Sequence, residues 1–170
     1  MKKYNCNVIL CGPAIGKTYL SKIDNRFIDI DGLKADYKYN LHNQTDKEKE
    51  QGKLNRGKVI NNDSSEYAIN LLKETIKNNK IALITYHQKI LNYIHENNIP
   101  YCLVYADIND LEEYASRMKN RGNSKDFIKE MTNKNSWKKF YYQNESDPKP
   151  TYKIKLKPGQ YLSDIKDLFI

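Results

Sequence analysis

Short apolar runs alternate with amphipathic stretches along this chain. Five runs have the length and the β-branched or aromatic side chains of buried strands, at residues 6–11, 27–31, 81–85, 101–106 and 152–156. Apolar residues recur at helical spacing from residue 19 onward and over residues 64–79, 89–97, 109–120, 126–142 and 162–169. Strands that alternate with helices predict an α/β fold, in which a five-stranded parallel sheet has helices on both faces.

Glycine and proline mark the expected boundaries of these elements. Gly122 should end the helix over residues 109–120 in the left-handed conformation, and Pro148 and Pro150 precede the last strand. The chain has 170 residues, a length typical of one domain, so we expect a single domain over residues 1–170. Residues 34–62 are polar and lack a clear period, which indicates helical fragments and loops inserted after the second strand.

Charge is distributed unevenly along the chain, whose formal net charge is +8. Residues 116–157 carry 12 basic and 4 acidic side chains, whereas residues 61–115 carry 4 basic and 8 acidic ones. A solvated lysine-rich surface and a site for a polyanion both fit this pattern. Because 25 lysines stand against 4 arginines, lysine abundance says little, and the arginines are the more informative cations.

The remaining composition narrows the classes of protein. Cys6, Cys11 and Cys102 lie in apolar surroundings without metal-type spacing, so we expect buried reduced thiols. The three histidines are scattered, which argues against a zinc site. Every apolar run is too short to span a membrane, and the N-terminus lacks an apolar core of signal length, so a cytoplasmic protein is expected.

A glycine-rich turn joins the first strand to the helix that follows it. Backbone N–H groups in such a turn, together with the start of the helix, can bind phosphate oxygens. Lys17 is placed to reach the β- and γ-phosphates, and the Thr18 hydroxyl is placed to bind Mg²⁺. The expected phosphate-binding residues are Gly12, Pro13, Ala14, Ile15, Gly16, Lys17, Thr18 and Tyr19.

Residues 11–18 resemble the Walker A motif of P-loop nucleotide-binding proteins. Cys11 stands where the full motif has its leading glycine, and Ala14 stands where adenylate-kinase-like loops usually have glycine. In the order of its elements the whole chain resembles the small P-loop nucleotide kinases, and it looks most like the compact phage-type (deoxy)nucleoside monophosphate kinases. The resemblance implies a three-layer P-loop NTPase fold that uses ATP and Mg²⁺.

Carboxylates that could serve the metal lie at the end of the second strand. Many P-loop proteins have an aspartate at the end of the third strand, but that strand ends here without an acid. Asp29 and Asp31 share one face of the second strand, and this Asp-x-Asp resembles that of shikimate-kinase-like small kinases. We assign Asp31 to the metal, with Thr18, and to catalysis, and Asp29 to the substrate. Asp107 is an alternative metal ligand, and Asp31-Gly32 is also compatible with an ordinary turn.

Arg117 and Arg121 are four residues apart on one helix face. Such a pair can bind phosphates and stabilise developing charge, or it can simply interact with the C-terminus of the helix. In adenylate-kinase-like enzymes the helix after the fourth strand delivers arginines to a mobile lid. By that resemblance residues 116–147 would form a lid, and Arg117 and Arg121 would be catalytic together with Lys17.

By the same resemblance, the inserted residues 34–62 would bind the phosphoryl acceptor. Arg56 is the only arginine of this segment and could hold an acceptor phosphate, and Lys34 is a further substrate candidate. His87 follows the third strand, where it would either face the acceptor or serve as a structural polar cap. Trp137 and Tyr141 lie at helical spacing and are expected in the core.

The leading interpretation is an ATP-dependent phosphotransferase that acts on a nucleotide-type acceptor, a (deoxy)nucleoside monophosphate. A polynucleotide-end or DNA-base kinase is the first alternative, and the basic segment over residues 116–157 favours it. A non-catalytic nucleotide-binding regulatory module is the second, since the third strand lacks its acid. The partners expected are nucleotides, with nucleic acid under the first alternative; nothing indicates a membrane or an obligate protein partner.

Overall fold

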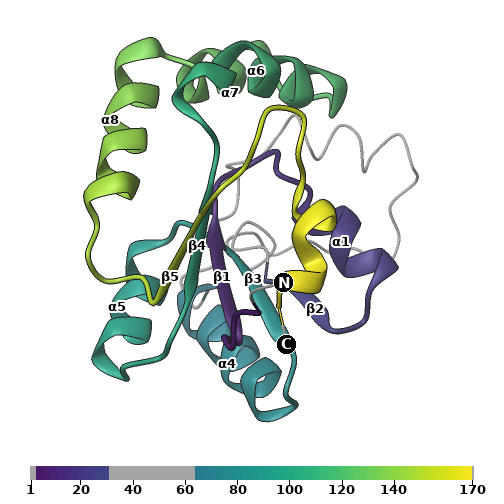
Figure 1. Ribbon diagram of the computed structural model, residues 1–170, viewed down its shortest axis with the longest axis vertical. Helices are drawn as coiled ribbons and strands as arrows, with labels where there is room; N and C mark the ends of the chain where they lie inside the picture. The colour runs from purple at the N-terminus through teal and green to yellow at the C-terminus, as the bar shows by residue number, and fades with distance from the viewer. Residues whose placement is uncertain (1–2, 31–63, 170) are drawn as a thin grey trace.

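The computed structural model describes residues 3–30 and 64–169, and it has an α/β architecture (Figure 1). The strands are β1 (Val8–Cys11), β2 (Phe27–Ile30), β3 (Ile81–Thr85), β4 (Cys102–Tyr105) and β5 (Tyr152–Lys155). The α-helices of the described ranges are α1 (Lys17–Ile23), α4 (Ser64–Lys77), α5 (Gln88–Glu96), α6 (Leu111–Asn120), α7 (Lys125–Met131) and α8 (Lys134–Ser146). Two 3-10 helices accompany them, η2 (Ile108–Asp110) and η3 (Leu162–Leu168).

All five strands are parallel, in the order β2-β3-β1-β4-β5. β1 is central: Leu10 pairs with Ile84 of β3 on one side and with Leu103 of β4 on the other. Strands β1 and β4 are buried throughout, which explains why their sequences are continuous apolar runs rather than alternating ones. The predicted five-stranded parallel sheet is therefore confirmed.

Strand alternation sends side chains into two separate cores. Ile9, Leu83 and Val104 pack on the face covered by α1, α6 and η3, which contribute Leu20, Tyr114 and Leu162. Leu10, Ile84 and Leu103 pack on the opposite face, which is covered by α4 and α5 through Leu72 and Ile90. Helices thus cover both faces of the sheet, as the sequence predicts.

The connections of β1 and β4 place a crevice at one edge of the sheet. From β1 the chain runs through α1 to β2 on one side, whereas from β4 it runs through α6, α7 and α8 to β5 on the other. Neighbouring strands whose connections leave in opposite directions form a crevice at their carboxyl ends, where ligands bind in open α/β sheets. In Figure 1, α6 and α7 lie beyond the end of β4, and α8 lies beside the sheet.

The turns on either side of α7 differ in how well the sequence predicts them: the turn at Gly122 agrees with the prediction, and the turn at Asn133 does not. Gly122 has φ +75°, and the N–H groups of Gly122 and Asn123 donate to the carbonyls of Lys119 and Met118, so it ends α6 as predicted. The single helix predicted over residues 126–142 is wrong, because the chain breaks it into α7 and α8. Asn133 caps α8 by accepting hydrogen bonds from the N–H groups of Asn135 and Ser136.

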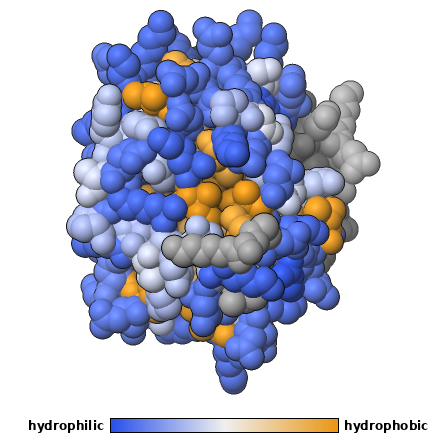
Figure 2. All heavy atoms as spheres, in the orientation of Figure 1, coloured by the Kyte–Doolittle hydropathy of each residue, from blue (hydrophilic) through white to orange (hydrophobic). Residues whose placement is uncertain are grey.

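The cysteines are free and buried, which confirms that expectation. Burial raises the pKa of the Cys11 thiol to about 11. Among the described residues no helix combines the length and the apolar character needed to cross a membrane. Figure 2 shows hydrophilic residues over most of the face in view, with apolar residues gathered in its middle, between β5 and η3.

Candidate functional site

A large cavity lies at the carboxyl ends of β1, β3 and β4. Its volume is about 1340 Å³, and its walls come from the β1–α1 loop, the strand ends, α6, α8 and the segment before η3. The sequence-predicted residues that line it are Gly12, Pro13, Ala14, Ile15, Gly16, Lys17, Thr18, Tyr19, Asp29, Arg117 and Arg121. Residues predicted from three separate segments of the sequence are therefore brought to one place.

Unpartnered buried polar atoms are concentrated around this cavity. Among the described residues, the buried side-chain nitrogen and oxygen atoms without a hydrogen-bond partner belong, apart from Nδ1 of His87, to residues that line it: Asp29, Tyr114, Arg117, Asn123 and Asn144. Buried polar groups are nearly always hydrogen-bonded, because leaving one unpaired costs about 1–3 kcal/mol. Their shared location makes the cavity the candidate site.

The β1–α1 loop adopts a tight, strained conformation. Gly16 has φ +94° and Ala14 has φ +60°, the left-handed region that residues with a Cβ rarely adopt. The loop therefore holds a residue with a Cβ, Ala14, in a strained conformation. The Lys17 ammonium donates to the carbonyl oxygen of Gly12 at 2.9 Å, so its charge stays inside the loop.

Thr18 and Asp29 form an oxygen pair beside the loop. The Thr18 hydroxyl donates to Oδ2 of Asp29 at 2.7 Å, while Oδ1 of Asp29 is buried without a partner. Mg²⁺ prefers one or two carboxylates, with phosphates and water completing its coordination, so this pair fits that ion. No cluster of three or more metal-binding side chains occurs in the described part of the chain. The sequence predicts that Thr18 shares the metal with Asp31, which lies outside the described residues. It does not reveal the contact between Thr18 and Asp29.

Arg117 is fixed from several directions. It is 7% exposed, forms an ion pair with Glu113, and donates from Nη2 to the carbonyl oxygen of Gln160 at 3.1 Å. Its guanidinium carbon lies 3.8 Å from the ring centroid of Tyr161 and 4.7 Å from that of Tyr114. Its Nε and Nη1 atoms are buried without partners. Arg117 is therefore a rigidly held cation with unused donors.

Arg121 differs from Arg117 although both line the cavity. It is exposed at the C-terminal cap of α6, and its side chain has no hydrogen bond or ion pair to any described residue. A free guanidinium at the rim can reach a ligand without breaking an existing interaction. Both arginines thus line the same cavity, Arg117 held by its neighbours and the Arg121 side chain free among the described residues.

Glu113 links this corner to the segment before η3. Its Oε2 accepts from the N–H of Gly159 at 3.0 Å, and its other oxygen pairs with Arg117. Burial opposes ionisation, but the Gly159 and Arg117 hydrogen bonds outweigh it and hold the pKa of Glu113 below its ordinary value. Glu113 therefore stays charged and keeps Arg117 in place.

Tyr161 is a cavity residue that the sequence did not reveal. It lies over Arg117, and a Cβ on Gly16 would come within 3.3 Å of its Cδ1 atom. The next residue, Leu162, donates its N–H to the carbonyl oxygen of Ile15 at 3.0 Å. The segment before η3 therefore joins the β1–α1 loop to Arg117. An isolated tyrosine carries no motif, so only the tertiary contact identifies it.

Aromatic and amide side chains form the other side of the cavity, at the ends of β3 and β4 and on α8. Tyr86, Tyr105, Phe140 and Asn144 line it there. Trp137 and Tyr141, expected in the core, are partly buried against it but also line the cavity. The face of α8 turned to the cavity was mistaken for a core face because both are apolar at helical spacing.

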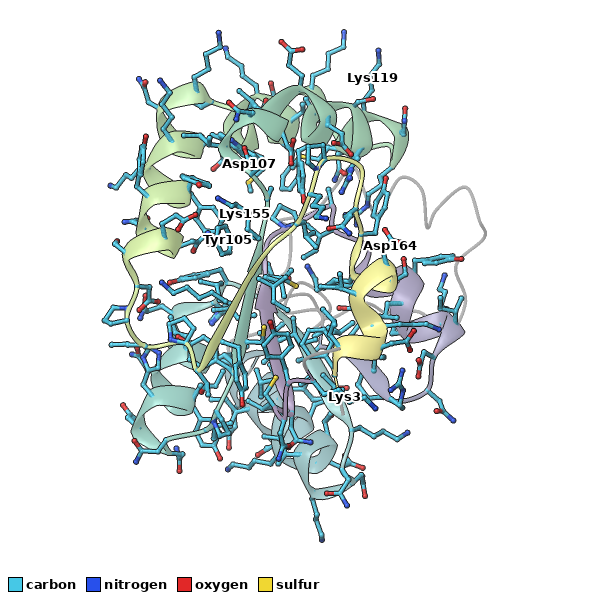
Figure 3. The ribbon with its side chains drawn as sticks, viewed as in Figure 1. Lys3, Tyr105, Asp107, Lys119, Lys155 and Asp164 are labelled. Atoms are coloured by element: carbon cyan, nitrogen blue, oxygen red, sulfur yellow. The ribbon has the colours of Figure 1, made fainter. Side chains whose placement is uncertain are left out.

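The structure does not bring every predicted residue into the cavity. His87 precedes α5 as its N-cap residue, and it is not among the cavity-lining residues. Asp107 accepts from the N–H of Asn109 at 3.0 Å and lies 3.7 Å from the Lys155 ammonium, so it is engaged outside the cavity (Figure 3). Lys34 and Arg56 lie outside the described residues, as does the rest of the predicted acceptor-binding insertion.

Lys155 also fastens α8 to the sheet. Its ammonium donates to the Tyr141 hydroxyl at 3.0 Å and to Glu145 at 3.2 Å, and the Tyr141 hydroxyl donates to Glu145 at 2.8 Å. The hydrogen bonds to Tyr141 and Glu145 raise the pKa of Lys155, and those from Tyr141 and Lys155 lower that of Glu145. This polar cluster positions the helix that forms the aromatic side of the cavity.

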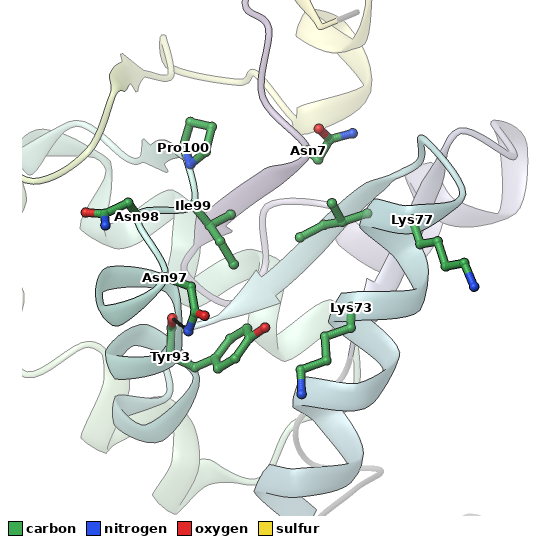
Figure 4. Close-up of a pocket in the computed structure, with 9 residues that line it drawn as sticks. Asn7, Lys73, Lys77, Tyr93, Asn97, Asn98, Ile99 and Pro100 are labelled. Atoms are coloured by element: carbon green, nitrogen blue, oxygen red, sulfur yellow. Dashed lines mark hydrogen bonds between the residues drawn. The ribbon is translucent and has the colours of Figure 1, made fainter.

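A second, smaller pocket lies at the opposite edge of the sheet, between α4 and α5 (Figure 4). Its volume is about 450 Å³, and Lys73, Tyr93, Asn97 and Ile99 are among its lining residues. The Lys73 ammonium lies 5.2 Å from the centroid of the Tyr93 ring. None of the sequence-predicted site residues lines this pocket, so the large cavity is the candidate site.

The loop geometry gives a prediction about stability. Gly16→Ala should lower the free energy of unfolding by about 1–2 kcal/mol, because alanine is strained at φ +94° and its Cβ would crowd Tyr161. Gly12→Ala is the matched control, since a Cβ there meets nothing within 4 Å. Urea unfolding of both variants measures the difference. Equal stability of the two would contradict the described loop.

Comparisons with known proteins add a structural neighbour. A scan of protein-family models and a search of curated proteins found no match. Among solved structures, the chain is similar to an uncharacterized protein from Eubacterium ventriosum, with 16% sequence identity and a TM-score of 0.45. The match covers 98% of this chain and 96% of that chain. A similarity of this size supports no functional assignment, so function is argued from the cavity.

Proposed function

We propose that the protein is an ATP-dependent phosphotransferase with a P-loop NTPase fold, and that its acceptor is a (deoxy)nucleoside monophosphate. The observation that carries the proposal is the meeting of Lys17 and the Thr18–Asp29 pair with Arg117 and Arg121 in one cavity. Phosphoryl transfer asks a protein chiefly for positioning and for stabilisation of negative charge. These residues supply both.

The phosphate loop would hold the triphosphate of the donor. The Lys17 ammonium has a carbonyl oxygen of its own loop as partner, and it would exchange that partner for a phosphate oxygen. The Thr18 hydroxyl and the Asp29 carboxylate would hold Mg²⁺ beside the loop. When bound, Mg²⁺ neutralises charge on the β- and γ-phosphates.

The two arginines would divide the work at the other end of the phosphates. Arg117 is held by Glu113 and Tyr161, so it offers donors whose position is set before the substrate binds. Arg121 is free at the cap of α6 and would move onto the transferring group. A fixed and a movable cation together suit a reaction in which charge changes position.

The size of the cavity favours two substrates over one. Sites for single small molecules commonly measure about 300–1,000 Å³, and this cavity exceeds that range at about 1340 Å³. Lys17, Arg117 and Arg121 lie on the loop and α6, whereas α8 lines the cavity with Trp137, Phe140 and Tyr141 and with one cation, Lys139. A triphosphate beside the loop and α6, together with the base of an acceptor on the α8 side, would occupy both parts of the cavity.

A coupled assay of ADP release tests the proposal. The acceptors to compare are nucleosides, nucleoside monophosphates, and the ends of DNA or RNA, each with ATP and Mg²⁺. We expect turnover with one or more monophosphates. Turnover with polynucleotide ends alone would replace the proposed acceptor class, and ATP binding without turnover on any acceptor would favour the regulatory module over an enzyme.

One observation favours the polynucleotide alternative. Lys134, Lys138 and Lys139 are exposed on α8, and Lys139 also lines the cavity, so a polynucleotide backbone could follow them. Binding of that kind weakens steeply as salt increases, because bound phosphates release counterions. A shallow salt dependence of DNA binding would dismiss this alternative.

Removal of the loop lysine should abolish transfer. Lys17→Ala should reduce kcat by at least about a hundredfold without unfolding the protein, because no other loop side chain can offset charge on the transferring group. Lys22→Ala, on the exposed side of the same helix, is the control and should keep its activity. An unchanged kcat in Lys17→Ala would rule out the phosphate-loop assignment.

The carboxylate that serves the metal can be identified by titration. Asp29→Asn should raise the Mg²⁺ concentration needed for half-maximal activity roughly tenfold, because the carboxylate beside Thr18 loses its charge. Asp31→Asn and Asp107→Asn, measured in parallel, should change it little. If Asp31→Asn produces the shift and Asp29→Asn does not, the metal belongs to Asp31, as the sequence suggested.

Substitution of Arg117 should mainly lower stability, whereas substitution of Arg121 should mainly lower catalysis. Arg117→Ala should lower the free energy of unfolding by about 2 kcal/mol, because it leaves the partly buried Glu113 carboxylate unpaired and removes two cation–π contacts. Arg121→Ala should leave stability unchanged and lower kcat more than it raises the KM for ATP. Urea unfolding and steady-state kinetics measure both effects. Equal losses of stability in the two variants would contradict the distinction.

A further inference from the structure

Asn144 on α8 is the most unusual polar residue of the cavity outside the phosphate-binding groups. It is 3% exposed, it lines the cavity, and its Nδ2 atom is buried without a hydrogen-bond partner. A buried amide donor that is left unpaired lowers the stability of the folded protein. Its position in the cavity wall suggests that a ligand supplies the missing acceptor atom.

The neighbours of Asn144 indicate what kind of ligand this is. Phe140 lies one helical turn earlier and also lines the cavity, and its ring packs edge-on against Tyr86 with the centroids 5.9 Å apart. Tyr105, at the end of β4, lines the same side. Aromatic side chains beside an amide suit a planar heteroaromatic ring, which stacks through its face and is read along its edge.

This part of the cavity is built by other elements than those that carry Lys17, Arg117 and Arg121, although Lys139 of α8 also lines the cavity. Tyr105 and Tyr141 pack with the core of the α4 and α5 face. Tyr114, about one helical turn before Arg117, and Leu162, next to Tyr161, pack with the core of the opposite face, as does Trp137 of α8. The phosphate loop follows β1, between the ends of β3 and β4. Asn144 comes from α8, whereas Arg117 comes from α6, and both line the cavity.

We propose that Asn144 determines specificity in the acceptor subsite: its Nδ2–H donates a hydrogen bond to an acceptor atom on the edge of a nucleobase that lies against Tyr86 and Phe140. The assignment of that base to the phosphoryl acceptor, rather than to the donor, rests on the proposed function. The hydrogen bond between Asn144 and the edge of a base does not depend on the proposed function.

The experiment measures binding and stability on the full chain. Trp137 is the one tryptophan of the chain and lines the cavity, so its fluorescence reports binding of each deoxyribonucleoside monophosphate and, separately, of ATP. Asn144→Leu removes the donor at similar volume, and Asn144→Asp replaces it with a carboxylate. Asn135→Leu, on an exposed position of the same helix outside the cavity, is the matched control.

We expect Asn144→Leu to raise the Kd of the best-bound monophosphate roughly tenfold while the Kd of ATP changes less than about twofold. Its Tm should rise by roughly 2–4 °C, because an unpaired buried amide is removed. A residue that only supports the fold would give the opposite change in Tm. Asn144→Asp should weaken the same monophosphate at least as much, and it carries the test if the leucine variant fails to fold.

Three results would overturn the inference: monophosphate binding that equals wild type in both variants, equal weakening of ATP and monophosphates, or no monophosphate binding to the wild-type protein. The outcomes separate it from the proposed function. Monophosphate binding that depends on Asn144, without ADP release, supports base recognition and refutes the phosphotransferase. ADP release that depends on Lys17 but not on Asn144 refutes the inference and supports the phosphotransferase.

Discussion

The burial of β1 on both faces and along both edges is the constraint on which the rest of the structure depends. Its four residues are apolar and fully buried, and its backbone pairs with β3 on one side and β4 on the other. A strand held in this way can neither slide nor tilt, because a shift of one residue would exchange its two core faces. The loop that follows β1 therefore starts from a fixed point at the centre of the sheet edge, between the ends of β3 and β4.

That fixed start allows the loop and its surroundings to be locally unfavourable. Ala14 adopts a left-handed conformation, and polar atoms of Asp29, Arg117 and Asn144 are buried without partners. Strained backbone and unpaired polar groups persist only where the surrounding structure holds them in place. Here the sheet holds the loop, the hydrogen bond from Leu162 to Ile15 holds the segment before η3, and the Lys155–Glu145–Tyr141 cluster holds α8. The strained backbone and the unpaired polar groups are thus concentrated at one cavity. Such groups lower the stability of the fold, and their concentration in one place is typical of a functional site.

The sequence predicts those features that depend on neighbours along the chain. The parallel sheet follows from apolar runs that alternate with helices, and the end of α6 follows from Gly122, because both are set by local periodicity and backbone conformation. The break between α7 and α8 was missed because Asn133 is a cap only if its side chain turns back onto the helix. The contact of Thr18 with Asp29 depends on how far β2 extends beside the loop, and strand alternation alone could not choose between Asp29 and Asp31. Tyr161 and Asn144 carry no motif; the place of Tyr161 over Gly16 and the missing partner of Asn144 are properties of the packed structure.

The distribution of charge within the cavity gives a sharper argument than the charge of the whole chain. Lysine is so abundant here that the net charge of the whole chain says little about ligands. Inside the cavity, however, Lys17, Arg117 and Arg121 come from the loop and α6 and Lys139 comes from α8, while the ends of β3 and β4 contribute Tyr86 and Tyr105. Lys17 is partnered by a backbone carbonyl, and Arg117 keeps two nitrogen atoms without partners among the described residues beside its ion pair with Glu113, so anionic oxygens can bind there. Aromatic walls beside an amide favour an uncharged ring. The cavity thus combines a cationic corner at the loop and α6 with aromatic side chains from α8 and the ends of β3 and β4. Under the proposed function, the β1–α1 loop would act at the boundary between two bound molecules, which is where a group passed from one to the other has to be held.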